Sequence, residues 1–231
     1  MFHVKHPIHL NDLFGFLKAY NYTISKKQGD LFHTYIDLIR NWSRCYHLIS
    51  RNDLTDIVER HILPCVFLYH LMVKRNKASL IDIGSGAGFP GIVLKIMQPD
   101  LKVVLIDSAR KKYLFLKEVV EILKIDCDVI SQRVEHYGLN ANRKFDIVVN
   151  RAVASLEILW KWALPIIKSD GIFYAMKGGD CRDELNKLNN EDVKIEIIHP
   201  MKEWIQFSDL LREKVIIQLS QLPSDNNSSL V

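Results

Sequence analysis

The chain has few cysteines, no long apolar run and little net charge. Its four cysteines lie far apart and form no Cys-x-x-Cys pair, which excludes a disulfide scaffold and predicts buried free thiols at Cys45, Cys65, Cys127 and Cys181. No apolar run approaches the roughly 20 residues that cross a bilayer. Residues 1–7 contain no apolar segment of the kind found in a secretory signal. We therefore expect a cytoplasmic protein.

The net charge of +4 is unevenly distributed along the 231 residues. Residues 1–79 hold 11 lysines and arginines against 6 acidic residues, whereas residues 80–231 hold 20 against 21. Seven of the nine histidines also lie in the first part. Because polyanions bind where positive charge is in local excess, this asymmetry predicts a nucleic-acid partner for the front of the chain.

Residues 1–78 are predicted to form a basic helical extension. Hydrophobic side chains recur three or four residues apart over residues 11–20 and 28–49, which is typical of amphipathic helices that cover a core. In the second segment, Tyr35 and Trp42 occupy core positions. Asp53 is a candidate N-cap for a third helix, which Pro64 is expected to kink or to replace with a new helix.

Residues 79–222 alternate between strands and helices, and residues 223–231 are expected to be disordered. Apolar segments predict seven strands, at residues 79–83, 102–106, 127–131, 145–150, 171–177, 193–199 and 212–219. Helices are predicted at residues 89–97, 110–124, 155–167 and 183–190. The pattern indicates an α/β fold with a mostly parallel sheet and helices on both faces. The last two strands are expected to form an antiparallel hairpin at one edge.

A glycine-rich loop, Asp82-Ile-Gly-Ser-Gly-Ala-Gly-Phe-Pro-Gly91, follows the first predicted strand and begins a helix. Glycines at such a crossover allow a tight turn and the close approach of a ligand. The glycines at 86, 88 and 91 match the dinucleotide pattern, with Asp107 about 20 residues further on. The glycines at 84, 86 and 88, preceded by Asp82, instead suit S-adenosylmethionine. The loop alone leaves both cofactors open.

Two carboxylates favour the methyl donor. Asp82 suits the ammonium group of S-adenosylmethionine and would repel a pyrophosphate, while Asp107 suits the ribose hydroxyls. Each also has a purely structural interpretation. Asp107 can cap the helix that starts near residue 110, and Asp82 can bind the backbone of the loop.

Taken together, several motifs resemble the bacterial small-subunit rRNA guanine-N7 methyltransferase family, RsmG or GidB. The resemblance covers about residues 28–220, in the order and at the spacings of the family. Its segments are Trp42-Ser43, Arg60-His-Ile-Leu63, Asp82-Ile-Gly-Ser-Gly-Ala-Gly-Phe-Pro-Gly-Ile92, Leu105-Ile-Asp-Ser108, Arg110-Lys-Lys112, Phe115-Leu116, Arg133-Val-Glu135, Asn150-Arg-Ala-Val-Ala-Ser155 and Tyr174-Ala-Met-Lys-Gly178.

The resemblance implies a class I S-adenosylmethionine-dependent methyltransferase, with a Rossmann-like seven-stranded domain over residues 79–222 and the helical extension before it. It implies methylation of N7 of one guanine in 16S rRNA, usually numbered 527. The cofactor-contacting positions of the family fall on Gly84, Phe89, Val134, Glu135 and Arg151, to which Asp82, Gly86 and Asp107 are added from the loop argument. The chain departs from the family at His47-Leu-Ile-Ser50 and Pro64-Cys65, which affects contacts of the extension only.

The expected chemistry needs no general base, because guanine N7 carries a free lone pair, and it depends on alignment of the reactants. Arg151 and Lys177 end adjacent predicted strands and are the candidate catalytic residues, holding a phosphate or the guanine O6 edge, unless they are merely solvated charges. Glu135 can accept from the adenine amino group, and Phe89 can pack on the cofactor.

The expected partner is 16S rRNA or a small-subunit assembly intermediate, bound by a monomer. The candidate phosphate contacts on the front of the chain are Lys26, Lys27, Arg40, Arg44, Arg51, Arg60, Lys74, Arg75 and Lys77. The histidines have no metal-ligand spacing, so no metal is expected. Two alternatives remain at this point, an NAD-dependent oxidoreductase that uses the same loop and a noncatalytic RNA-binding protein.

Overall fold

A computed structural model describes residues 7–72, 77–139, 143–151, 154–188 and 193–222. The expected tail at residues 223–231 and the candidate phosphate contacts Lys74 and Arg75 lie outside the described residues. No helix in the described part of the chain is long and apolar enough to span a membrane.

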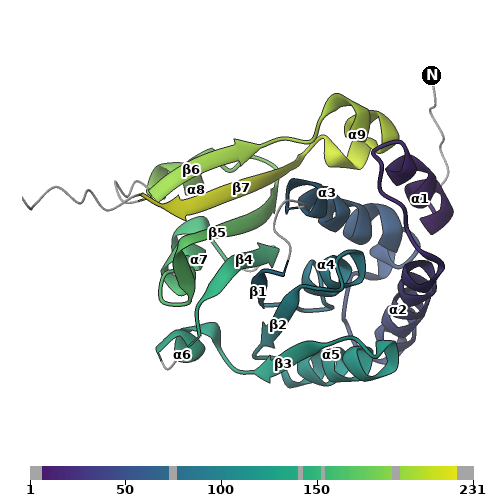
Figure 1. The fold of residues 1–231 in the computed structure, drawn as a ribbon, viewed down its shortest axis with the longest axis horizontal. Coiled ribbons are helices and arrows are strands. Elements are labelled where there is room, and N and C mark those ends of the chain that lie inside the picture. Colours follow the sequence, from purple (N-terminus) through teal and green to yellow (C-terminus); the bar gives the residue numbers. More distant parts are fainter. Residues whose placement is uncertain (1–6, 73–76, 140–142, 152–153, 189–192, 223–231) are drawn as a thin grey trace, which may run out of the picture.

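The front of the chain is helical, as predicted (Figure 1). It comprises α1 (Leu10–Lys18), α2 (Lys26–Cys45), a 3-10 turn (Arg51–Asp53), one π-helical turn (Val58–Ile62) and α3 (Leu63–Met72). Ser25 caps α2 in a capping box with Gln28. The Gln28 amide also donates to the carbonyls of Ile96 and Met97, 2.9 and 3.1 Å away, and so ties the extension to the end of α4 (Gly91–Met97).

Three predictions for this region are corrected. Asp53 is not the N-cap of a third helix, because it ends the 3-10 turn and its carboxylate lies 3.2 Å from the His61 ring. The thiols are all free but not all buried, since Cys45 is exposed where α2 ends. Pro64 lies where the π-helical turn passes directly into α3, so the helix continues through this position with a changed hydrogen-bonding pattern and no separate helix begins there.

The sheet has seven strands in the order β3-β2-β1-β4-β5-β7-β6. The strands are β1 (Ser79–Ile83), β2 (Lys102–Asp107), β3 (Cys127–Ser131), β4 (Phe145–Arg151), β5 (Ile167–Gly178), β6 (Val193–Ile198) and β7 (Lys214–Gln221). The pairs from β3 to β5 are parallel, while β7 is antiparallel to both β5 and β6. The predicted parallel sheet with an antiparallel edge is confirmed. Two helices were missed, α6 (Val134–Leu139) after β3 and α9 (Lys202–Phe207), which connects β6 to β7 and precedes a 3-10 turn (Asp209–Leu211). The helix predicted over residues 155–167 is shorter, because β5 already begins at Ile167.

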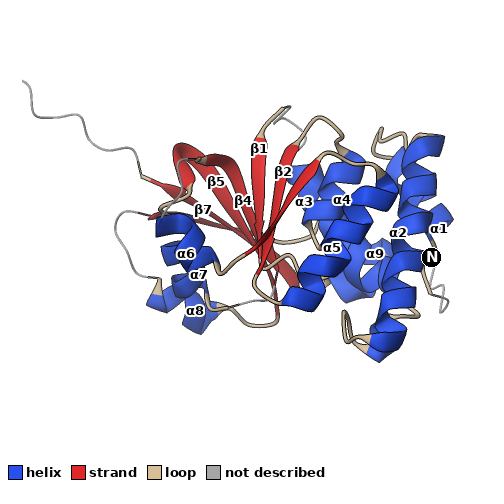
Figure 2. Ribbon diagram, turned by 90° about the horizontal axis from the view of Figure 1, so that it is seen from below, coloured by secondary structure: helices blue, strands red, loops and turns tan. Residues whose placement is uncertain are grey.

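Helices cover both faces of the sheet, as predicted (Figure 2). One face carries α4 and α5 (Arg110–Leu123) with the extension outside them, and the other carries α6 (Val134–Leu139), α7 (Leu156–Ala163) and α8 (Arg182–Lys187). The extension shares one hydrophobic core with α4 and α5, because Phe32 and Tyr35 belong to the same buried cluster as Leu94 and Phe115. The side chain of Trp204 in α9 is fully buried and contacts α1 and α3 through aromatic neighbours. Elements from both ends of the chain, the extension and α9, therefore pack together on the sheet domain.

Candidate functional site

The glycine loop lies between the carboxyl end of β1 and the start of α4. Gly84, Gly86 and Gly88 have positive φ angles of 67°, 59° and 92°, which L side chains rarely adopt. The backbone N–H groups of Gly84 and Ser85 both donate to the carbonyl of Ile106 on β2, at 2.9 and 3.1 Å. The loop therefore folds across the ends of two neighbouring strands.

Two of the glycines are required by packing inside the protein. A Cβ atom on Gly91 would overlap the Leu105 side chain and would lie 2.8 Å from the Asp82 carboxylate. A Cβ atom on Gly88 would lie 2.6 Å from Ile92 and 2.9 Å from the Tyr35 hydroxyl. At Gly86, by contrast, the nearest atoms would be 3.8 Å away or further. The dinucleotide spacing thus has a structural explanation at two of its three positions.

Asp82 is fully buried beneath this loop. Its Oδ2 atom accepts the backbone N–H of Gly91 at 2.9 Å, so the structural interpretation from the sequence is correct for one oxygen. The other oxygen, Oδ1, is buried and has no hydrogen-bond partner among the described residues. Burial raises the pKa of this carboxyl group from 3.8 to about 7. A buried acceptor of this kind fits a cationic or hydrogen-bond-donating ligand group.

Both carboxylate oxygens of Asp107, at the end of β2, accept hydrogen bonds from backbone N–H groups. It accepts the N–H of Gly86 at 2.9 Å and the N–H of Ala109, the residue before α5, at 2.8 Å. The carboxylate therefore joins the glycine loop to the residue before α5, but it does not cap that helix, because its partner is the N–H of the N-cap residue Ala109. It is 8% exposed, so part of the side chain is still reachable from outside.

The helical extension contacts the loop directly. Tyr35 is fully buried, which confirms its predicted core position, and its hydroxyl donates to the Ala87 carbonyl at 2.5 Å. The His61 ring stacks on Phe89 with 4.9 Å between ring centroids and 28° between planes. The sequence reasoning missed both contacts. The only signal for the first was a tyrosine, with its hydroxyl, at a core position.

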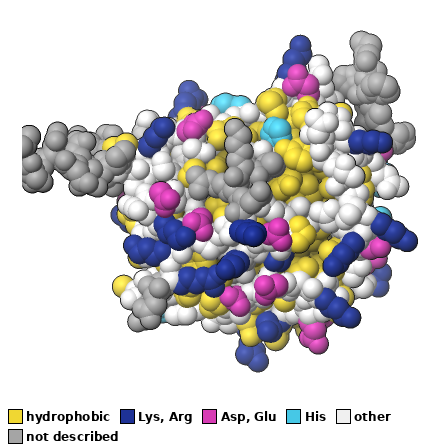
Figure 3. Space-filling view, in the orientation of Figure 1, with side chains coloured by type: hydrophobic (Ala, Val, Ile, Leu, Met, Phe, Trp, Pro, Cys, Tyr) yellow, Lys and Arg dark blue, Asp and Glu magenta, His cyan; other side chains and the backbone are white. Residues whose placement is uncertain are grey.

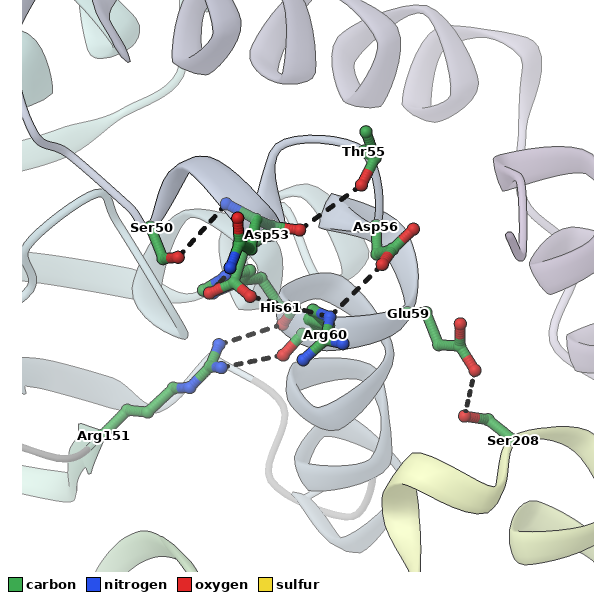
Figure 4. A network of polar contacts seen from close by, with 10 residues as sticks. Ser50, Asp53, Thr55, Asp56, Glu59, Arg60, His61, Arg151 and Ser208 are labelled. Atoms are coloured by element: carbon green, nitrogen blue, oxygen red, sulfur yellow. Dashed lines mark hydrogen bonds and ion pairs between the residues drawn. The ribbon is translucent and has the colours of Figure 1, made fainter. Parts of the chain in front are cut away.

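Arg151 ends β4 and points at the π-helical turn, toward Arg60 and His61 (Figure 4). Its guanidinium donates to the main-chain carbonyls of Arg60 and His61, at 2.8 and 3.4 Å, and lies 5.8 Å from the centroid of Phe89. Arg151 is therefore not a solvated surface charge. It fastens the π-helical turn of the extension to the end of the sheet.

Burial, together with the nearby positive charge of Arg151, lowers the pKa of His61 to about 4. The opposing contribution comes from Asp53, whose carboxylate lies 3.2 Å from Nε2. His61 is therefore neutral at pH 7. Its place over Phe89 is that of an aromatic packing residue, and no group of three or more metal-ligating side chains occurs in the described ranges.

The remaining predicted residues lie along the same edge of the sheet. Val134 is buried and Glu135 half-buried in the first turn of α6, which follows β3. Lys177, near the end of β5, has a mostly buried side chain whose ammonium donates to the Ala154 carbonyl at 2.7 Å and to Glu184 at 2.8 Å. Because the carboxyl ends of parallel strands share one edge, the topology gathers all predicted site residues there.

The family model for rRNA small subunit methyltransferase G matches residues 28–203. The chain belongs to this family. The protein of that name from Acetivibrio thermocellus is 35% identical over 204 residues, which is 87% of this chain and 84% of the relative. The one from Clostridium botulinum (strain Loch Maree) is 35% identical over 205 residues, which is 86% of this chain and 85% of the relative.

Solved structures with low sequence identity share the fold of this chain. A mutant of MtNAS solved in complex with S-adenosylmethionine superimposes with a TM-score of 0.58 at 12% identity, covering 85% of this chain and 76% of that one. The plantazolicin methyltransferase BpumL, in complex with SAH, superimposes with a TM-score of 0.55 at 14% identity, covering 85% and 99%. The fold is thus the Rossmann-like methyltransferase fold that the resemblance implied.

The buried carboxyl group of Asp82 predicts a pH dependence of stability. Between its unfolded pKa near 3.8 and its folded pKa of about 7, the folded chain holds a proton that the unfolded chain has lost. The free energy of unfolding therefore falls as the pH rises from 4 towards 7. Asp82→Asn keeps an acceptor for the Gly91 N–H and cannot ionise.

We expect the unfolding free energy of Asp82→Asn, relative to the unsubstituted protein, to increase steadily across this pH range. Urea denaturation at several pH values, without cofactor, measures the difference. A difference that does not change with pH would contradict the placement of Asp82 in a buried site.

Proposed function

We propose that this chain transfers a methyl group from S-adenosylmethionine to N7 of a guanine in 16S rRNA, the one usually numbered 527. Membership of the rRNA small subunit methyltransferase G family supports rRNA methylation. The observation that carries the choice of cofactor is the unpartnered Asp82 oxygen buried under a glycine loop that has free space at Gly86. The guanine, its N7 atom and its position come from the family resemblance of the motifs.

The residues fit S-adenosylmethionine group by group. The free Asp82 oxygen suits the ammonium group, and Asp107 suits the ribose hydroxyls. Val134 and Glu135 suit the adenine, through an apolar contact and an acceptor for its amino group. Gly84 and Gly86 keep the turn free of side chains where the cofactor would approach, and Phe89 forms an apolar wall. Two of the glycines in the dinucleotide spacing are explained by packing, and the acid at position 82 disfavours a pyrophosphate.

The bound cofactor supplies an electrophilic methyl group to the N7 lone pair. The protein has no proton to remove from N7, so its contribution is to hold the guanine in line with the transferred group. Arg151 and Lys177 are the proposed positioning residues, since they end adjacent strands at this edge. Lys177 shares its charge with Glu184, which leaves Arg151 as the stronger candidate for the guanine O6 edge.

The proposed partner is 16S rRNA or a small-subunit assembly intermediate, met in the cytoplasm by a monomer. The candidate phosphate contacts among the described residues of the extension are all exposed, namely Lys26, Lys27, Arg40, Arg44, Arg51, Arg60 and Lys77. Arg40 and Arg60 also form ion pairs with acidic neighbours. On the face seen in Figure 3, lysines and arginines are spread out with acidic side chains between them. This distribution favours RNA contacts at several separate places.

The cofactor proposal predicts the effect of Gly84→Asp. The substitution forces a side chain into a left-handed backbone conformation and adds a negative charge above Asp82. We expect affinity for S-adenosylhomocysteine, measured by calorimetry, to fall by more than about 100-fold. Gly179→Asp is the matched control, because Gly179 also has a positive φ, 74°, with open space around it. Wild-type affinity in a folded Gly84→Asp protein would place the cofactor elsewhere.

The substrate proposal is tested on 16S rRNA from a strain that lacks the gene for this chain. Mass spectrometry is expected to show that N7-methylguanine is lost at the target position and restored by the purified protein with S-adenosylmethionine. Persistence of the modification in that strain would refute the substrate assignment. Salt-dependent RNA binding without any methyl transfer would favour the noncatalytic alternative.

A further inference from the structure

A cavity of about 130 Å³ lies beside the proposed reaction centre, between α3, the ends of β4 and β5, and the start of β7. Its apolar walls come from buried side chains of α3 and of the strands, and three cationic residues also line it. The apolar lining residues are Pro64, Phe67, Met176, Leu211, Val215 and Ile216. The cationic ones are Arg151, Lys177 and Lys214.

The topology places this cavity next to the proposed cofactor site. The cofactor residues lie at the ends of β1 and β2 and after β3, whereas the cavity lies at β4, β5 and β7, further along the same edge. Arg151 belongs to both, because it lines the cavity and also faces Phe89 of the glycine loop. A group in the cavity would therefore contact Arg151, which also lies beside the glycine loop.

Among the three cations, Lys214 has the most hydrogen-bonding capacity to spare. Lys177 is paired with Glu184, and Arg151 donates to two main-chain carbonyls. Lys214 is half-buried at the start of β7, opposite Gly178 of β5, and its ammonium has no hydrogen bond or ion pair within the described ranges. A Cβ atom on Gly178 would come within 3.3 Å of this ammonium, so the glycine leaves room for it.

Apolar walls with an unpaired ammonium at the rim suit a nucleotide, whose base is flat and apolar on its faces and whose phosphate is anionic. The volume of about 130 Å³ is that of a few water molecules, at roughly 30 Å³ each, which limits the occupant to a single base. Guanine N7 in an RNA helix lies in the deep, narrow major groove that side chains cannot reach. The target base must therefore be unstacked to be methylated.

We propose that this cavity receives the unstacked target guanine and that Lys214 binds its phosphate. The proposal rests on the proposed function and extends it by naming the base pocket and a positioning residue on β7. Each lining group contacts a different part of the nucleotide. The apolar walls contact the base, Lys214 contacts the backbone, and Arg151 contacts the edge of the base on the side of the glycine loop.

The test compares Lys214→Gln with Lys194→Gln, which removes the same charge from an exposed position on the neighbouring strand β6. At saturating S-adenosylmethionine, we expect Lys214→Gln to raise the KM for 16S RNA about tenfold with kcat nearly unchanged, as for the loss of one phosphate contact. Lys214→Arg is expected to restore the KM. Affinity for S-adenosylhomocysteine is expected to be unchanged in all three variants, because none of them alters the glycine loop.

Inhibition by small molecules distinguishes the contribution of the phosphate to binding from that of the base. Guanosine monophosphate is expected to compete with RNA better than guanosine does, and Lys214→Gln is expected to abolish this advantage. A KM for Lys214→Gln equal to that of Lys194→Gln, or an equal loss for nucleotide and nucleoside, would overturn the proposal. Inhibition by neither compound would overturn it too.

If the proposed function itself is wrong, the experiments give a different result from the one that overturns the pocket alone. In that case the unsubstituted protein transfers no methyl group to any RNA. Direct calorimetry of guanosine monophosphate against the unsubstituted protein and Lys214→Gln then still decides whether the cavity binds a nucleotide. Binding that is stronger to the unsubstituted protein supports the pocket, and equal or absent binding overturns it.

Discussion

The hydrogen bond between the buried Asp82 carboxylate and the Gly91 N–H holds the turn on which the proposed site depends. It fixes the start of α4 directly against β1, and this approach is so close that position 91 tolerates no side chain. The same carboxylate keeps one oxygen without a partner, at a free-energy cost that a bound ligand group can offset. The group that stabilises the local fold is thus also the one proposed to recognise the cofactor. In this proposal, stability and cofactor binding are linked through a single ionisable side chain.

The second consequence of this turn concerns the helical extension. The glycine loop, once folded, presents the Ala87 carbonyl to the Tyr35 hydroxyl and the Phe89 ring to His61. Arg151 completes the contact from the sheet side by donating to the carbonyl of His61. The extension therefore contacts the glycine loop directly and shares its hydrophobic core with the sheet domain. A partner that binds the extension would act on the same elements that shape the proposed site.

Sequence patterns predicted the features that depend on local spacing. Apolar segments separated by helices predicted the seven-stranded sheet, and the glycines with Asp107 predicted a turn at the ends of β1 and β2. The pattern did not predict the π-helical turn or the position of Asp53, because both depend on where His61 and Arg151 lie in the folded chain. Periodicity shows which face of a helix is apolar, but not which polar atom of another element that face meets. The contact of Tyr35 with Ala87, 52 residues away, is of this second kind.

The lining of the cavity was also beyond sequence reasoning. Lys214 follows a 3-10 turn and begins a strand that inserts between β5 and β6, and only this order of strands brings it beside Lys177 and Gly178. In the sequence, Lys214 is one of many charged residues in a mostly neutral part of the chain. Only the structure shows that acidic residues pair with Lys177 and Arg212, while Lys214 has no ion pair among the described residues.

The central claim is that the extension and the glycine loop form one unit with the cofactor site. Amide hydrogen exchange of residues 84–92 tests it most directly, in the unsubstituted protein and in Tyr35→Phe, with and without S-adenosylhomocysteine. Tyr22→Phe is the control, because the Tyr22 hydroxyl bonds His70 within the extension. We expect faster exchange in the loop for Tyr35→Phe alone, by about fivefold for one lost hydrogen bond of about 1 kcal/mol, and slower exchange in both the loop and α2 when the ligand binds. Loop exchange that is the same in both variants, or ligand protection that stops at the loop, would contradict the claim.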